Sequence, residues 1–173
     1  MGRLLSLTVI MVSVGCVSSP TFETTEQIQL QFVGTVAVLP FSGHDGDQFS
    51  SYVTEELILR KVRTVDEGQV RTILSEQRIN IADISDDEVN LSKLCESFGA
   101  DTLVIGSIDP VISSHSGEPM RKISNASISF FSLNEGGVIA SAHYSASPGA
   151  SFSRLMLYPK CAEQLVDKVV RPP

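Results

Sequence analysis

The segment that most constrains the fold is GADTLVIGSID, residues 99–109. Three apolar residues, Leu103, Val104 and Ile105, lie at its centre. A glycine precedes the run and an Asp-Pro pair follows it, so we expect the strand to end near Pro110. A short uninterrupted apolar run is typical of a strand buried on both faces, which requires helices above and below it.

The segments before this run predict two strands and three helices. We expect strands at 33–41 and 62–65, and helices at about 49–57, 67–78 and 88–98, because apolar residues recur there at strand or helical spacing. The Ser85 to Glu88 stretch matches a capping box for the third helix. Gly99 is placed to end that helix in a left-handed conformation.

After Pro110 the pattern changes to alternation. Residues 126–130 and 138–144 alternate apolar and polar side chains around a turn at 134–137, which predicts an antiparallel hairpin with one apolar and one polar face. We expect a loop at 115–119 and a final helix at about 159–170, with Pro159 in its first turn. The order β-α-β-α-α-β-β-β-α predicts a single α/β domain with a mixed sheet of about five strands and helices packed on it.

Charge excludes one class of partner. The 173 residues carry a formal net charge of −7 and no run of basic residues. Nucleic acids and anionic surfaces require clustered Lys and Arg, so we do not expect the chain to bind nucleic acid.

The N-terminus predicts export. Arg3 precedes an apolar stretch, residues 4–14, that is too short to span a bilayer as a helix but suits a secretory signal. The stretch ends in Val14-Gly15-Cys16, which resembles a bacterial lipobox. That resemblance implies cleavage before Cys16 and a lipid anchor, with palmitate among its acyl chains, on the Cys16 thiol. An ordinary signal peptide with an incidental cysteine is the alternative.

These features divide the chain into three parts. We expect a signal peptide at 1–15, the lipidated Cys16 with a tether at 16–32, and the folded domain at 33–171. No Asp follows Cys16 directly, so we expect the periplasmic face of the outer membrane. The two remaining cysteines, Cys95 and Cys161, lie on apolar helix faces, which predicts buried thiols; a disulfide between them is the alternative in a compartment that permits one.

The cluster most like a ligand site is His44, Asp45 and Asp47 in the loop after the first strand. Imidazole and carboxylates can bind a divalent metal, but this spacing matches no zinc or EF-hand pattern, and such residues ordinarily serve as turn and cap residues. His143 alternates with serines and predicts a solvated position, and His115 lies in the expected loop. The chain shows no nucleophile elbow and no phosphate loop, so we expect neither enzymatic activity nor a cofactor.

Three segments in order, following the lipobox, carry a family resemblance: 36–41 (VAVLPF), 65–77 (VDEGQVRTILSEQ) and 98–108 (FGADTLVIGSI). Together they resemble the CsgG family of curli-secretion lipoproteins and its relatives, which include the penicillin-binding-protein activator LpoB and the flagellar lipoprotein FlgO. The resemblance implies a non-enzymatic α/β domain that works through protein contacts in envelope assembly, secretion or peptidoglycan synthesis.

Three functions remain open from the sequence. The first is a lipid-anchored adaptor that uses the polar hairpin face and the loop around His115. The second is an oligomeric ring subunit of a curli-type secretion apparatus, although residues 108–125 are polar, contain two prolines and do not predict a membrane-inserting hairpin. The third is a metal or small-ligand module at His44, Asp45 and Asp47.

Overall fold

The structure is a computed structural model that describes residues 21–25, 28–29, 34–79, 88–115, 118–147 and 150–171. Its strands are β1 (Thr21–Thr24), β2 (Ile28–Gln29), β3 (Thr35–Val38), β4 (Arg63–Thr64), β5 (Thr102–His115), β6 (Glu118–Ser132), β7 (Gly137–Ser145) and β8 (Val170–Arg171). Its helices are α1 (Gly46–Leu59), α2 (Glu67–Glu76), α3 (Glu88–Phe98), α4 (Tyr158–Val169) and a short 3-10 helix, Phe152–Arg154.

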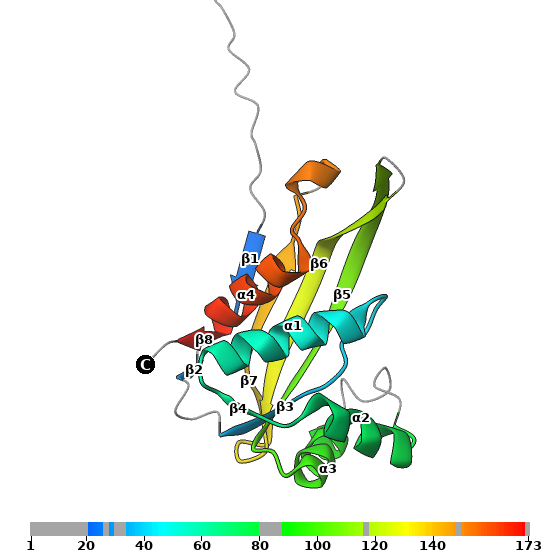
Figure 1. The fold of residues 1–173 in the computed structure, drawn as a ribbon. Coiled ribbons are helices and arrows are strands. Elements are labelled where there is room, and N and C mark those ends of the chain that lie inside the picture. Colours follow the sequence, from blue (N-terminus) through cyan, green and yellow to red (C-terminus); the bar gives the residue numbers. More distant parts are fainter. Residues whose placement is uncertain are drawn as a thin grey trace, which may run out of the picture.

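Two sheets organise these elements (Figure 1). The main sheet has six strands in the order β1-β7-β6-β5-β3-β4, and β2 and β8 form a parallel pair. Strand β3 pairs in parallel with both β4 and β5, whereas β5, β6, β7 and β1 pair in antiparallel fashion. The α/β class and the mixed sheet predicted from the sequence are confirmed, with more strands than the five or so expected.

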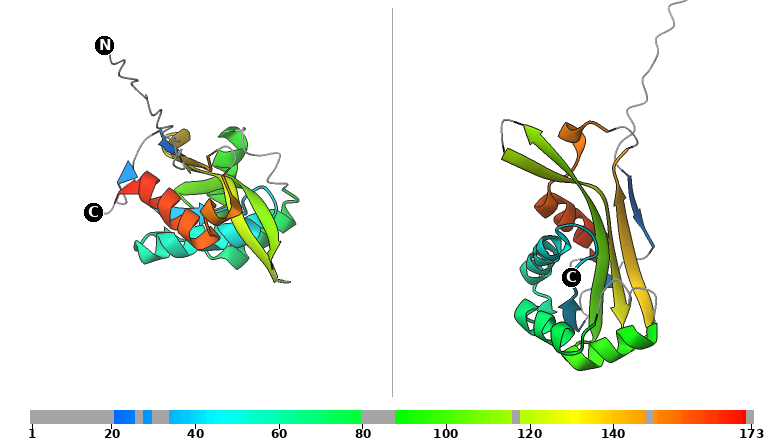
Figure 2. Two further views of the ribbon diagram at one scale, coloured as in Figure 1. Left: turned by 90° about the horizontal axis from the view of Figure 1, so that it is seen from above. Right: turned by 90° about the vertical axis from the view of Figure 1, so that its right-hand side faces the viewer.

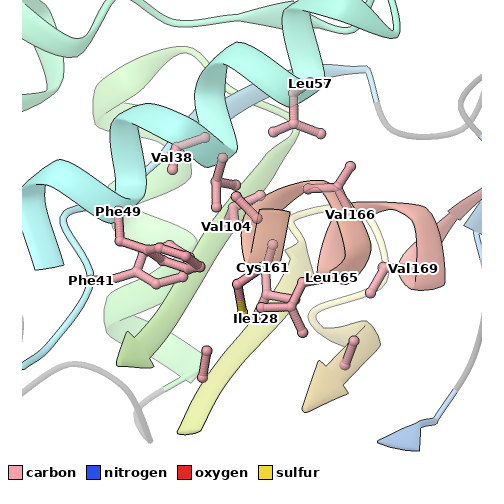
Figure 3. Close-up of a cluster of buried hydrophobic side chains, with 14 of the residues drawn as sticks. Val38, Phe41, Phe49, Leu57, Val104, Ile128, Cys161, Leu165, Val166 and Val169 are labelled. Atoms are coloured by element: carbon pink, nitrogen blue, oxygen red, sulfur yellow. The ribbon is translucent and has the colours of Figure 1, made fainter. Parts of the chain in front are cut away.

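The apolar run of β5 is buried on both faces, as predicted. Val104 is fully buried in a cluster with α1 and α4, which includes Leu57 and Leu165 (Figure 3). Leu103 points the opposite way and is fully buried in a second cluster with α2 and α3. Two helical layers therefore cover opposite faces of the parallel part of the sheet, because successive strand residues alternate between faces.

Local signals near the ends of the elements are also confirmed. Gly99 adopts a φ of +62° directly after α3, and Gly136 adopts +66° in the turn between β6 and β7. Helix α4 carries Pro159 in its first turn. Residues 85–87 of the predicted capping box lie outside the described residues. Among the described residues, no helix is both long and apolar enough to cross a membrane.

The predicted end of the central strand at Pro110 is wrong. Strand β5 continues to His115 and pairs with β6 along its whole length, with a register shift between Asp109 and Pro110. An irregularity of this kind accommodates a proline within a paired strand. His115 pairs with Glu118, so both residues belong to strands, and the loop expected at 115–119 is shorter than predicted. Residues 108–115 and 118–125 thus belong to paired strands that the sequence pattern did not predict.

Two further differences concern the antiparallel part of the sheet. Val138 was expected on the apolar face but is 55% exposed, because the register of β6 and β7 shifts between Phe130 and Phe131. The segment 16–32, expected to be a tether, contributes β1 to the main sheet and β2 to the small one. Phe22 of β1 contacts Tyr144 of β7 with ring centroids 5.1 Å apart, so the folded part begins at or before Thr21.

Candidate interaction surface

A polar surface lies on the face of β5, β6 and β7 that points away from α1 and α4. We call it the serine face, and its residues are Ser107, Ser127, Ser129, Ser141, His143 and Ser145. These residues pair across the strands, for example Ser107 with Ser127 and Ser127 with His143. The polar face predicted from the alternating pattern is therefore present, and it is continuous across three strands.

Helices cover only one end of this side of the sheet. The cluster with α2 and α3 reaches Leu103 and Phe131, which lie at the end of the sheet near the β6–β7 turn. In the right-hand view of Figure 2, α1 and α4 lie along one side of the sheet and α3 crosses its lower end. Ser107 and His143, further along the strands, are exposed. The other four residues of the serine face are half-buried, and within the described structure no helix covers it beyond the end near the β6–β7 turn.

Several hydroxyl groups of this surface have hydrogen-bond partners in the sheet. The Oγ atoms of Ser107 and Ser127 lie 2.8 Å apart, and Ser145 Oγ donates to Asn125 Oδ1 at 3.0 Å. At the edge of the sheet, the Ser141 backbone N–H donates to Thr25 Oγ1 at 3.1 Å. Polar groups that already have partners lose less when water is removed than unpaired groups do. The serine face can therefore stay hydrated or accept a protein surface.

The loop cluster predicted as a weak metal candidate does not assemble as a ligand set. Asp45 Oδ2 accepts hydrogen bonds from Arg121 Nη1 at 2.7 Å and from the hydroxyl of Tyr158 at 3.2 Å. Asp47 Oδ2 instead pairs with Arg71 at 3.3 Å, and His44 Nε2 lies 3.6 Å from Asp45 Oδ1. The carboxylates contact different cations, and among the described residues no group of three potential ligands converges.

Asp45 joins three elements. It precedes α1, Arg121 belongs to the outer part of β6, and Tyr158 begins α4. The side chain of Asp45 is 14% exposed, against 41% for Arg121. Burial, followed by the charge and hydrogen bond of Asp45, raises the pKa of Tyr158 to about 12. The sequence pattern indicated Asp45 but neither of its partners, since they lie 76 and 113 residues away and no pattern links them to Asp45.

Both cysteines of the domain are free and buried. Cys161 lies in the cluster with α1 and α4, and Cys95 lies in the cluster with α2 and α3 on the opposite face of the sheet. The alternative of a disulfide between them does not hold in the structure. Burial raises the pKa of Cys161 to about 12; burial, with smaller contributions from Asp101 and Glu96, raises that of Cys95 to about 11.

Other candidates from the sequence have separate positions. His143 is exposed on the serine face, as expected, and pairs in register with Glu23 of β1. His115 ends β5, and its side chain lies outside the described residues, as does all of Cys16. The serine face, the Asp45 contacts and each of the two thiols therefore lie at separate places in the fold.

Comparison with solved structures identifies the fold. Two crystal structures of the PelC dodecamer from Paraburkholderia phytofirmans match with TM-scores of 0.56 and 0.55, at 14% and 13% identity, each over 88% of this chain and 99% of that chain. Lipoprotein GNA1162 from Neisseria meningitidis matches with a TM-score of 0.49, 14% identity, and 78% and 96% of the two chains. The C-terminal domain of LpoB from Escherichia coli matches with a TM-score of 0.43 at 10% identity, over 66% of this chain and 83% of that chain.

The matched structures show a likeness of fold. No protein-family model and no curated protein sequence matches the chain. LpoB, to which three sequence segments led us to expect a resemblance, is among the matched structures, and the two PelC structures show the fold. The chain has the fold of the PelC subunit over nearly its whole folded part.

Proposed function

We propose that the chain is a lipid-anchored, non-enzymatic adaptor on the periplasmic face of the outer membrane. It acts by protein–protein contact in envelope assembly, secretion or peptidoglycan synthesis. The open serine face is the observation that carries this proposal, because an uncovered and internally hydrogen-bonded sheet face suits a protein partner. The lipobox at Cys16 supports the anchor.

The position of β1 sets how close the adaptor works to its membrane. Thr21 already pairs with Ser145, and it comes five residues after Cys16. Five residues span at most about 18 Å even when fully extended. A lipid on Cys16 therefore holds the domain directly beside the leaflet. Its partner, in this proposal, is a membrane-proximal protein and not one across the cell wall.

A matched pair of substitutions tests the serine face. Ser107 and Ser75 are both exposed serines, but Ser107 lies on the serine face and Ser75 lies on α2. We expect Ser107→Arg to reduce the amount of partner that co-purifies with the gently extracted protein, whereas Ser75→Arg leaves it unchanged. Circular dichroism checks that both variants remain folded. Equal partner recovery from the two folded variants would rule out the serine face as the contact.

A ring subunit is the second candidate, and one observation favours it. The matched PelC chains are subunits of a dodecamer, and the fold of this chain covers 99% of each. Light scattering of the lipidated protein in mild detergent separates the candidates. A discrete mass of many subunits supports the ring, whereas a monomer or a one-to-one complex supports the adaptor.

The third function, a metal or small-ligand module, has less support. Asp45 and Asp47 are engaged by Arg121 and Arg71 respectively. A metal that took both carboxylates would have to break these ion pairs and move Asp45 away from the hydroxyl of Tyr158.

A further inference from the structure

Among the described residues, the outer part of the β5–β6 hairpin has no neighbouring strand. We call it the distal ribbon, and it comprises residues 110–115 of β5 and 118–123 of β6. β7 ends opposite Asn125, and β3 pairs with β5 only as far as Val104, with one further bridge at Ser107. Within the described chain, the ribbon has a single further backbone bridge, between Ile123 and Met156 at its base. A two-stranded ribbon alone is marginally stable in water, so a covering surface is expected.

The distal ribbon exposes large apolar side chains. Ile112 is 52% exposed, Met120 is 51% exposed and Val111 is 37% exposed. Val111 and Ile112 are consecutive strand residues, so their side chains point to opposite faces of the ribbon. A flat protein partner would cover one face only. A medium that surrounds the ribbon covers both, and this favours lipid over a second copy of the chain.

The ribbon and the N-terminus lie at the same end of the molecule. Thr21 pairs with Ser145, Ser145 with Asn125, and Asn125 with Asp109, so these residues form one row across the sheet. β1 begins at this row with Thr21, and the ribbon extends beyond the row from Asp109 and Asn125. Six residues of β5 follow Asp109. At the rise of a strand they extend about 20 Å along the ribbon.

The reach of the chain from Cys16 to Thr21 and the length of the ribbon together bring the ribbon within reach of the membrane. A chain anchored at Cys16 holds Thr21 within about 18 Å of the leaflet, which is comparable with the length of the ribbon. We propose that the distal ribbon inserts Val111, Ile112 and Met120 into the boundary between headgroups and acyl chains of that leaflet. This inference rests on the proposed lipid anchor. The ribbon then acts as a second, weaker membrane contact that fixes the orientation of the domain.

The charges of the ribbon base agree with an interfacial position. Lys122 Nζ lies 5.1 Å from the centre of the Phe152 ring and donates to Ser153 O at 3.2 Å, and Arg121 is paired with Asp45. Long basic side chains can keep their charged ends at the polar level while their stems lie against apolar surface. Arg121 and Lys122 can therefore stay at the polar level while Val111, Ile112 and Met120 contact the interface, and Glu118 at the tip enters the headgroup layer.

Tryptophan fluorescence tests this contact, because the chain contains no tryptophan. The variant Ile112→Trp places a single reporter on the ribbon. The matched control Val138→Trp places one at a similarly exposed position, 55% against 52%, near the β6–β7 turn at the other end of the sheet. Each full-length lipidated variant is reconstituted into vesicles of phosphatidylethanolamine and phosphatidylglycerol, with and without lipids brominated on their acyl chains.

We expect the emission of Ile112→Trp to shift to shorter wavelength and to be quenched by brominated lipid, with neither effect for Val138→Trp. Flotation of the vesicles reports the anchor independently. Flotation without quenching of Ile112→Trp overturns the ribbon contact and leaves the anchor standing. A blue shift without quenching shows burial against protein and also overturns it. Loss of flotation refutes the anchor and the ribbon contact together. Met120→Trp replaces Ile112→Trp if that variant does not fold.

Discussion

Replacing Asp45 with alanine tests how the loop before α1 holds the hairpin and α4 together. The Asp45 carboxylate accepts one hydrogen bond from Arg121 and one from Tyr158. Its side chain is 14% exposed, so water only partly replaces the lost acceptor. Tyr158 is 5% exposed, and its hydroxyl would lose this partner in a nearly dry position. Both partners are therefore affected by one substitution.

The expected loss follows from the exposure of each partner. Arg121 is 41% exposed, and an ion pair at such a site contributes at most about 1 kcal/mol. A buried hydroxyl left without a partner costs about 1–3 kcal/mol. We therefore expect Asp45→Ala to lower the free energy of unfolding by about 2 kcal/mol. Asp45→Asn keeps an acceptor and tolerates the observed φ of +62°, so its loss should be below about 1 kcal/mol.

Urea unfolding followed by circular dichroism measures both variants. A double-mutant cycle with Arg121→Ala isolates the ion pair, for which we expect a coupling of about 0.5–1 kcal/mol. The reasoning would be refuted if Asp45→Ala unfolded within about 0.5 kcal/mol of the unchanged protein, the range of an ordinary surface substitution. Equal losses for Ala and Asn would show that charge, and not the Tyr158 hydrogen bond, dominates.

Three further predictions concern packing and titration. A Cβ on Gly106 would lie 2.2 Å from the Ser127 carbonyl oxygen, so Gly106→Ala should lower the free energy of unfolding in urea by about 1–3 kcal/mol. The control Gly137→Ala should leave it unchanged, because a Cβ there meets nothing within 4 Å. Cys95 and Cys161 should resist a thiol reagent at pH 8, because burial raises their pKa values to about 11 and about 12, and both should react after unfolding. A disulfide between the two cysteines, seen as no reaction after unfolding, would contradict this prediction. The pKa of Tyr158 is raised to about 12, so ionisation of its phenol is less favourable in the folded than in the unfolded protein. Its contribution to stability is therefore complete below pH 10 and is lost as pH rises to about 12. We expect the free energy of unfolding of Tyr158→Phe to depend less steeply on pH in this alkaline range.

The sequence predicted the helical half of the fold well, because its signals are local. Gly99 follows the end of α3, Pro159 lies in the first turn of α4, and Leu103 and Val104 alternate between two cores. Each of these features depends on residues within a few positions along the chain. The order of the central elements follows from such signals alone.

The sequence did not predict features that depend on distant pairing. Pro110 is a local end signal, but pairing with β6 carries the strand past it through a register shift. Strand β1 consists of only four residues with no apolar alternation, and it forms because β7 offers an edge and Phe22 packs on Tyr144. The serine face was predicted from alternation, whereas the ribbon beyond it was not, since proline and polar residues masked its strands.

Asp45 shows how a residue that breaks a local rule can point to a distant contact. It precedes α1 with a φ of +62°, and its side chain makes no capping hydrogen bond to the helix, although an Asp before a helix usually does so. The carboxylate instead reaches Arg121 at the base of the distal ribbon and Tyr158 at the start of α4. The base of the ribbon is thus tied to the start of both helices, by these contacts and by the bridge between Ile123 and Met156. A rigid arm is what the proposed membrane contact requires, because a freely hinged ribbon could touch lipid without orienting the serine face.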